Sequence, residues 1–475
     1  MKSNDINRRR FLGTVAAASA GIATSGFTPV FGHSRDSSDK LIGSGNHTVK
    51  GEILSPMQDE NRYLTIFDVY TDAKGFRRER HELSTAQDDF NEGYRVCYSD
   101  DNGRSWSEWK DIYANTYDQI GPKGEHERER LDFLANIYNP VHRHFVSVGM
   151  ERIYAYGHET AYRNFWGGQG MGFSDHCYLC VRNEGTDVSI PHLIKFEEGI
   201  DYNPANPIDE NYFYKNCAYF SKAWVMNCGD VIFSIAPTVA TCCRLLGIDA
   251  KEIFPSAPHL LNGLIVGRGK WNGEKYELSF SRPVIISDLK SSRGIDEPMI
   301  AELKNGRLLV VFRGSNVQSS NWNTRIEPGT PGHKWYCYSD DGGMTFTDPV
   351  PWHFDNGEVI YSPASIAYFL RSSKNGKLYW FGNITDHTVN GNWPRYPLQM
   401  VEIDETYGTA KRDTLTVIDT RRDDESPFVQ LSNFVLLDDR ETGDIECYLT
   451  KICTLGTEPD RLWRGAAWKY RIQLE

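Results

Sequence analysis

Two segments of the chain repeat one short pattern, and this pattern constrains the fold more than any other feature. Residues 99–106 and 339–346 both read Ser-x-Asp-x-Gly-x-x, followed by Trp in the first segment and Phe in the second. In such a segment the Asp carboxylate can accept hydrogen bonds from turn amides, the Gly supplies positive φ, and the aromatic ring packs beneath the turn. We therefore predict a tight β-hairpin turn at each position, within a repeated β architecture.

Four other segments predict hairpins, because short runs rich in β-branched and aromatic residues flank a Gly-containing turn. They are residues 224–233, 301–312, 368–381 and 434–448. Asn305-Gly306 and Asn375-Gly376 suit type I′ turns, in which both central residues take positive φ. Repeated hairpins without intervening helices predict an all-β fold, a six- or seven-bladed β-propeller with four-stranded antiparallel blades.

Composition divides the chain into three parts. Residues 1–32 resemble a twin-arginine export signal, because Arg8-Arg9 precede Phe11-Leu12 and a small-residue apolar run. That run is too short and too rich in Ala, Gly and Ser to span a bilayer, so we expect no stable membrane insertion. Residues 33–50 are predicted to be a flexible linker and 51–475 a single β-propeller catalytic domain. The resemblance implies a periplasmic or secreted protein.

Charge and cysteine content narrow the partners. The formal net charge of −12 argues against a nucleic-acid or membrane-surface partner. Among the ten cysteines, Cys177-x-x-Cys180 directly follows His176. Two interpretations are open, a zinc-binding Cys/His cluster or buried free thiols on strands. We favour buried thiols, assign no metal ligands and expect no required cofactor.

The repeated Ser-x-Asp-x-Gly pattern resembles the Asp-box of sialidase-like propellers, where it is structural. Within that resemblance, residues 293–313 are similar to the sialidase blade that carries an inner-strand Glu and a later Arg. Glu297 lies eight residues before Asn305 and Arg313 eight after it, so the hairpin should bring both to one rim. A salt bridge that only caps this hairpin is the alternative. Arg395 resembles a further substrate-binding arginine, and paired guanidinium groups suit a carboxylate.

Two departures from sialidases change the expected chemistry. The chain has no Arg-Ile-Pro motif, and residues 430–434, comparable to the segment that carries the sialidase tyrosine nucleophile, contain no tyrosine. The arrangement is more similar to propeller lyases that act on uronic acids, the ulvan lyases and rhamnose–glucuronate lyases. In these enzymes arginines neutralise the uronate, and a Tyr or His removes the proton next to it.

The candidate base and the remaining arginines follow from position. Tyr219 stands eight residues before Asn227, the same spacing as Glu297 before Asn305, so it should reach the same rim from another blade. A blade-packing role for this tyrosine is the alternative. His158 and His176 lie in a Gly-rich aromatic stretch and titrate near neutral pH. The predicted catalytic residues are Tyr219, His158, His176 and Glu297, and the predicted substrate-binding residues are Arg313, Arg395, Arg293 and Arg244.

We therefore predict an enzyme that acts on an acidic oligosaccharide or polysaccharide containing uronic acid. It would use β-elimination, as a lyase or as a dehydratase. One alternative is an exo-acting glycoside hydrolase that uses Glu297 with Asp296 or Asp175. The other is a non-catalytic glycan-binding propeller.

Overall fold

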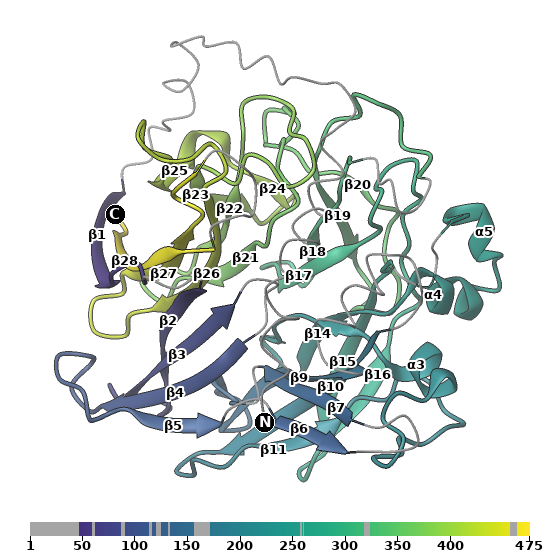
Figure 1. The fold of residues 1–475 in the computed structure, drawn as a ribbon, viewed down its shortest axis with the longest axis horizontal. Helices are drawn as coiled ribbons and strands as arrows, with labels where there is room; N and C mark the ends of the chain where they lie inside the picture. Colours follow the sequence, from purple (N-terminus) through teal and green to yellow (C-terminus); the bar gives the residue numbers. More distant parts are fainter. Residues whose placement is uncertain are drawn as a thin grey trace, which may run out of the picture.

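The protein is a six-bladed β-propeller in the computed structural model, which describes residues 47–58, 62–86, 91–113, 116–119, 125–131, 134–155, 172–256, 259, 261–317, 324–456 and 463–475. Figure 1 shows the six antiparallel sheets arranged in a ring. The predicted all-β class and four-stranded blades are confirmed, and the blade number is six. The predicted export signal over 1–32 lies outside the described residues.

Successive blades follow one another along the chain. The first contains β2 (Arg62–Tyr70), β3 (Arg78–Ala86), β4 (Asn91–Ser99) and β5 (Lys110–Tyr113). The second contains β6 (Thr116–Gln119), β7 (Glu125–Leu131), β8 (Ile137–Asn139), β9 (His144–Ala155), β10 (Phe173–Asn183) and β11 (Ile190–Leu193). The third contains β12 (Tyr219–Phe220), β13 (Trp224–Val225), β14 (Val231–Ala236), β15 (Ile265–Trp271) and β16 (Tyr276–Phe280).

The other three blades complete the ring. The fourth contains β17 (Asp296–Glu302), β18 (Leu308–Arg313), β19 (Lys334–Ser339) and β20 (Val350–Pro351). The fifth contains β21 (Tyr368–Arg371), β22 (Leu378–Asn383), β23 (Leu398–Asp404), β24 (Thr409–Ala410) and β25 (Thr416–Asp419). The sixth contains β26 (Gln430–Asp438), β27 (Ile445–Ile452), β28 (Gly465–Gln473) and β1 (Thr48–Ser55).

The sixth blade closes the ring by pairing the two ends of the described chain. β1 is its outermost strand and pairs antiparallel with β28, from Thr48 opposite Gln473 to Ser55 opposite Ala467. The predicted linker over 33–50 is therefore wrong at its end, since β1 begins at Thr48. A polar segment can serve as an outer strand because β28 supplies its backbone hydrogen bonds and solvent receives most of its side chains.

Apolar packing joins most neighbouring blades. Every residue of β14, β18, β22 and β27 is buried, because these middle strands are covered on both faces by the adjacent blades. Leu309 of the fourth blade packs with Trp380 of the fifth, and Phe381 of the fifth packs with Phe434 of the sixth. In these four blades the fully buried strand therefore lies in the middle of the sheet.

Buried charges instead join the sixth blade to the first. The Arg78 side chain lies 2.7 Å from Glu446 and 3.3 Å from Asp439, and all three are buried. The Tyr448 hydroxyl donates to Asp68 at 2.8 Å and to Glu446 at 2.6 Å. Ionised groups at this depth require such pairing, so the closure of the ring depends on matched charges.

Both Ser-x-Asp-x-Gly turns have the predicted geometry. Asp101 Oδ1 accepts from the amides of Arg104 and Ser105 at 3.0 and 2.8 Å. Asp341 Oδ1 accepts from the corresponding amides of Met344 and Thr345, both at 3.0 Å. The two turns join the third and fourth strands of the first and fourth blades.

The four predicted hairpins are present, but the predicted type I′ turns are wrong. Gly306 and Gly376 take φ of 83° and 69°, whereas the asparagine before each does not take positive φ. The Asn305 side chain instead accepts from the Arg307 amide at 3.1 Å. An asparagine that bonds its own turn leaves the left-handed position to the glycine that follows.

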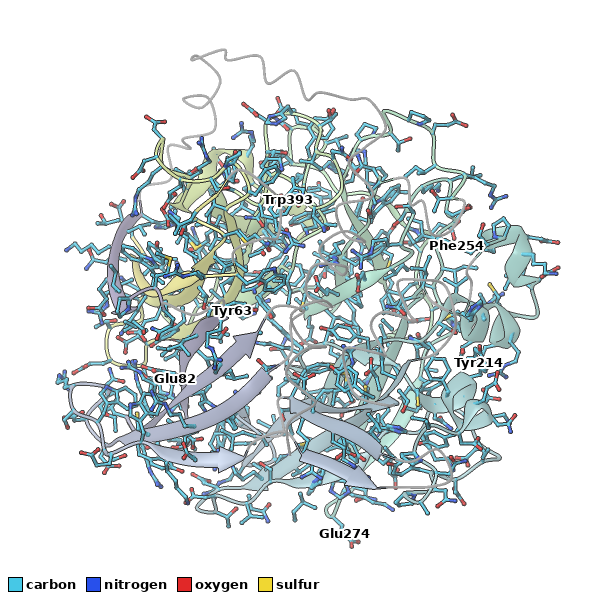
Figure 2. The ribbon with its side chains drawn as sticks, viewed as in Figure 1. Tyr63, Glu82, Tyr214, Phe254, Glu274 and Trp393 are labelled. Carbon is cyan, nitrogen blue, oxygen red and sulfur yellow. The ribbon has the colours of Figure 1, made fainter. Side chains whose placement is uncertain are left out.

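Helices lie outside the blades, mostly beside the third. They are α3 (Glu210–Asn216), α4 (Val239–Leu246), α5 (Ala250–Ile253) and the short η2 (Arg412–Thr414). α4 and α5 interrupt the third blade between β14 and β15, so the expectation of hairpins without intervening helices is wrong there. Figure 2 shows Tyr214 and Phe254 among these helices at the outer edge. Within the described part of the chain, no helix is long and apolar enough to cross a membrane.

Candidate functional site

The predicted Glu297–Arg313 pair forms the centre of the candidate site. Arg313 ends β18 opposite Asp296, the first residue of β17. Its Nη1 donates to Glu297 Oε2 at 2.8 Å, and its Nη2 lies 3.0 Å from Asp296 Oδ2. The predicted proximity of Glu297 and Arg313 is therefore confirmed, and Asp296 is a second carboxylate of the same group.

A local backbone distortion brings these two consecutive carboxylates together. Successive side chains of a regular strand point to opposite faces. Here the pairing of β17 with β18 shifts between Asp296 and Met299, and Glu297 takes a φ of 45°. Positive φ is costly for a residue with a Cβ, and such strain concentrates at functional sites. The irregularity turns both carboxylates toward one guanidinium group.

Two further predicted arginines belong to this group. Arg395 donates from Nη1 to Gln430 Oε1 at 2.6 Å and from Nη2 to the Ala364 carbonyl at 3.0 Å. Arg293 lies in the loop before β17. Burial, followed by the charge of nearby Arg313, lowers the pKa of Arg293 to about 10. The charges of Asp296, Glu297 and Arg395 also act on Arg293, so these residues surround one centre.

Lys334 is a member of the group that the sequence analysis missed. It begins β19 directly opposite Arg313, its side chain is only 1% exposed, and its Nζ donates to the Ser365 carbonyl. Burial and the Arg313 charge lower the pKa of Lys334 to about 7, although Glu297 and Asp296 act in the opposite direction. The β18–β19 register would have revealed it, but a long loop separates these strands in sequence.

Tyr219 approaches the same centre from the third blade, as predicted. It is the first residue of β12, and its pKa is raised by burial and by the negative charges of Glu297 and Asp296. The Arg152 guanidinium carbon lies 5.7 Å from the centroid of the Tyr219 ring. Tyr219 and Arg152 therefore extend the site from the fourth blade across the third to the second.

The remaining predicted residues are not part of this group. The His176 ring is fully buried, bonds the Pro207 carbonyl at 2.9 Å through Nε2, and packs against Tyr202 and Tyr212. No surface of it is open to a substrate, so its predicted catalytic role is not supported by this position. Arg244 lies in the last turn of α4 and pairs with Glu197. His158 lies outside the described residues.

The ten cysteines are free thiols, and all but Cys228 are buried. Cys177 and Cys180 are buried in β10, which agrees with the favoured interpretation of packed thiols. Cys217 Sγ lies 3.9 Å from His176 Nδ1. Across the described ranges, no three His, Cys, Asp or Glu side chains are grouped so that they could hold a metal ion.

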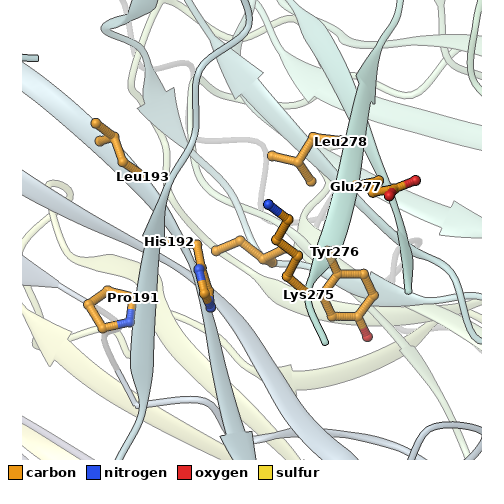
Figure 3. Close-up of a pocket in the computed structure, with 8 residues that line it drawn as sticks. Pro191, His192, Leu193, Lys275, Tyr276, Glu277 and Leu278 are labelled. Carbon is orange, nitrogen blue, oxygen red and sulfur yellow. The ribbon is translucent and has the colours of Figure 1, made fainter. Parts of the chain in front are cut away.

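Two surface hollows lie away from the charged centre. The one in Figure 3 has a volume of about 680 Å³ and is formed by the outer strands β11 and β16, with exposed His192, Lys275 and Glu277 at its wall. The other, of about 690 Å³, lies between β1 and the first Ser-x-Asp-x-Gly turn, where cations and carboxylates alternate. Neither is lined by residues of the centre, so neither replaces it as the candidate site.

The charge balance of the centre favours a negatively charged ligand. It contains four cationic side chains, Arg293, Arg313, Arg395 and Lys334, but two carboxylates, Asp296 and Glu297. An excess of buried positive charge is stabilised by an anion, and guanidinium groups bind carboxylates through paired hydrogen bonds. The arrangement can therefore hold a carboxylate beside a phenol and a second carboxylate.

Solved structures that align with this chain include a sialidase and an arabinofuranosidase. A protein of unknown function from Dyadobacter fermentans aligns with 90% of this chain and 99% of its own, at 12% identity and a TM-score of 0.51. The NanB sialidase from Streptococcus pneumoniae aligns with 86% of this chain and 68% of its own, also at 12% identity and 0.51. An α-L-arabinofuranosidase from Fusarium graminearum covers 90% and 98% at 11% identity and 0.44.

The fold and the comparisons together define the class. The chain is a six-bladed β-propeller, as the repeated Ser-x-Asp-x-Gly turns predicted, and its fold is similar to that of the NanB sialidase. No protein-family model matches the chain, and no curated protein matches its sequence.

Proposed function

We propose that this protein is a glycoside hydrolase that removes a carboxylate-bearing sugar from the end of a glycan. The excess of positive charge around Arg313 is the observation that carries this proposal. Arg293, Arg313 and Arg395 would bind the sugar carboxylate. Lys334, which lies opposite Arg313, would add a further positive charge. A neutral sugar would bring no negative charge to this group of cations, so the site should favour an acidic sugar over it.

Tyr219 and Glu297 are the proposed reacting pair. Burial and the neighbouring carboxylates raise the pKa of Tyr219, so the resting phenol keeps its proton. During reaction the Tyr219 oxygen would bond to the anomeric carbon while its proton passes to Glu297. The bond to the leaving oxygen breaks, and that oxygen takes a proton from solvent. Water then bonds to the anomeric carbon and displaces the Tyr219 oxygen, to which Glu297 returns its proton. The water loses one proton to solvent, which replaces the proton that the leaving oxygen took.

Elimination next to a uronate is the second candidate function. It is favoured by the first residue of β26, Gln430, which accepts a hydrogen bond from Arg395. This segment is comparable to the one that carries a tyrosine in sialidases. The same cations would acidify the proton beside the carboxylate. Tyr219 would then remove that proton after giving up its own, a step that its raised pKa opposes in this reaction as in hydrolysis.

Product chemistry separates the two candidates. The purified chain is incubated with oligosaccharides that end in a uronic or sialic acid, and with the same compounds after reduction of the carboxylate to an alcohol. Hydrolysis releases a saturated acidic sugar, which mass spectrometry detects. Elimination yields an unsaturated uronate, which is detected by its ultraviolet absorbance. Equal turnover of the carboxyl-reduced compounds would show that the cationic centre does not select an acid. Arg313→Met should remove turnover, whereas Arg244→Met, on α4, should not.

We also propose that the chain is exported through the twin-arginine route. Cell fractionation of the wild type and of Arg8→Lys/Arg9→Lys tests this proposal. Export that is unchanged by the double substitution would contradict it.

A further inference from the structure

A second arginine–carboxylate pair lies behind Tyr219, in the neighbouring blade. Arg152 of β9 is directly opposite Asp175 of β10. The Arg152 Nε and Nη2 atoms donate to the two Asp175 oxygens at 2.6 and 2.8 Å. The side chains are only 13% and 9% exposed. This paired geometry fixes the plane of the guanidinium group as well as its position.

Aromatic rings contact that guanidinium group. Its central carbon lies 4.4 Å from the centroid of the Phe173 ring and 5.7 Å from that of Tyr219. Arg152 therefore connects the second blade to the tyrosine of the third. A cation close to an aromatic ring is attracted by the ring, more strongly where water is excluded.

Backbone contacts fix Tyr219 to the same strand. The amide of Ala218, the preceding residue, donates to the Asp175 carbonyl at 3.1 Å. The Ala218 carbonyl accepts from Cys177 Sγ at 2.9 Å. Asp175 thus contributes its side chain to Arg152 and its carbonyl to the backbone beside Tyr219. The second blade therefore contacts the Tyr219 ring through Arg152 and the backbone beside it through Asp175 and Cys177.

The charges around Tyr219 make Arg152 important to its chemistry. Glu297, Asp296 and burial all oppose formation of a phenolate at this tyrosine, and Arg152 opposes their effect. When Tyr219 passes its proton to Glu297, Glu297 becomes neutral, and the Tyr219 oxygen carries negative charge near the carboxylate of Asp296. Arg152 offsets this negative charge from the second blade, and its paired hydrogen bonds to Asp175 hold it in place.

We propose that Arg152, held by Asp175, is a positioning residue that orients the Tyr219 ring and offsets negative charge on its oxygen during reaction. The reacting role of Tyr219 rests on the proposed function, whereas the coupling between Arg152 and Tyr219 does not depend on the substrate.

Kinetics of matched variants test the role of Arg152. Arg152→Met should lower kcat about tenfold, the effect expected of one desolvated cation–ring contact, and leave KM within about twofold. Arg152→Lys should recover part of the loss, and the pH of half-maximal rate should move upward in Arg152→Met. Arg268→Met is the control, because Arg268 forms a similar pair with Asp230 in the third blade at 2.6 Å. Equal kcat and pH profiles in both Met variants would overturn the proposal.

A spectroscopic measurement tests the coupling without any substrate. With tyrosine labelled by ¹³C at Cζ, the resonance absent from Tyr219→Phe belongs to Tyr219. Its shift should change in Arg152→Met and not in Arg268→Met, and no change in either would overturn the inference. If no acidic sugar is turned over by the wild type, the proposed function fails while this measurement still decides the coupling. Arg152→Met/Asp175→Asn removes both charges together and replaces the single variant if that variant does not fold.

Discussion

Binding of an acidic sugar should transfer a proton from solvent to Lys334. This lysine is almost fully buried, and burial together with the charges of Arg313 and Arg395 lowers its pKa to about 7, against the opposing effects of Glu297 and Asp296. Lys334 therefore loses its proton nearer to neutral pH than an ordinary lysine does. A sugar carboxylate bound by the arginines adds a negative charge nearby and favours the charged amine.

The size of this effect depends on the distance between the sugar carboxylate and the Lys334 amine, which we take as about 8 Å. Two unit charges about 8 Å apart at an effective dielectric constant of about 20 interact by about 2 kcal/mol. That energy raises the pKa of Lys334 by about 1.5 units on binding, from about 7 to about 8.5. The complex holds more protons than the free protein within this window, so the Kd should rise with pH there, by up to about 30-fold. Below about pH 7 the Kd should be constant.

Calorimetry in two buffers of different ionisation enthalpy measures the proton uptake directly. Lys334→Met should abolish the uptake, weaken binding below neutral pH, and make the Kd independent of pH across the window. Uptake that persists unchanged in Lys334→Met would show that another group titrates. A wild-type Kd that does not vary with pH would refute the placement of a substrate carboxylate beside Lys334.

Three further predictions concern the reacting tyrosine and the stability of the ring. Tyr219→Phe should remove turnover while calorimetry shows acidic-sugar binding within about threefold of the wild type, because the cations remain. Arg78→Met should lower the free energy of unfolding in urea by about 3–5 kcal/mol, because it removes the buried guanidinium group that faces Glu446, Asp439 and Asp68, whereas Arg104→Met, which removes an exposed pair, should cost under about 1 kcal/mol. Hydrogen bonds from Thr345 and Ser339 keep the pKa of Asp341 low. The Asp341 carboxylate therefore stabilises the fold above its ordinary pKa, and this stabilisation is lost as the pH falls. Asp341→Asn should lower the Tm at neutral pH and make the Tm fall less steeply in acid.

The centre of the site could be predicted where one tight turn determines the register. Glu297 and Arg313 are separated from Asn305 by the same number of residues in the sequence. A hairpin brings two such positions together, independently of how the other blades fold. The same arithmetic placed Tyr219 at the right rim. Counting residues from the turn did not identify Asp296 as a second partner of Arg313. The count assumes that side chains alternate between the two faces of a strand, and the backbone irregularity at Glu297 interrupts this alternation.

Residues that depend on distant pairing escaped prediction. Lys334 meets Arg313 only after a long loop returns the chain to β18, and Arg152 meets Tyr219 only when the second and third blades pack. Alternation along β10 explains the misassigned histidine. Asp175 and His176 are consecutive and face opposite sides, so only one of them can lie beside Tyr219. The sequence identifies two polar residues there without showing which side faces the site.

The register of the fourth blade separates its structural turn from its chemistry. Arg313 pairs with Lys334 at one end of β18 and β19, whereas Leu308 pairs with Ser339 at the other, where the second Asp-box turn begins. The charged centre therefore lies at one rim and the turn that stabilises the blade at the opposite rim. Because these groups share no hydrogen bonds, substitutions in the centre should leave the turn intact. Such a separation allows the chemistry of one rim to change while the same propeller persists.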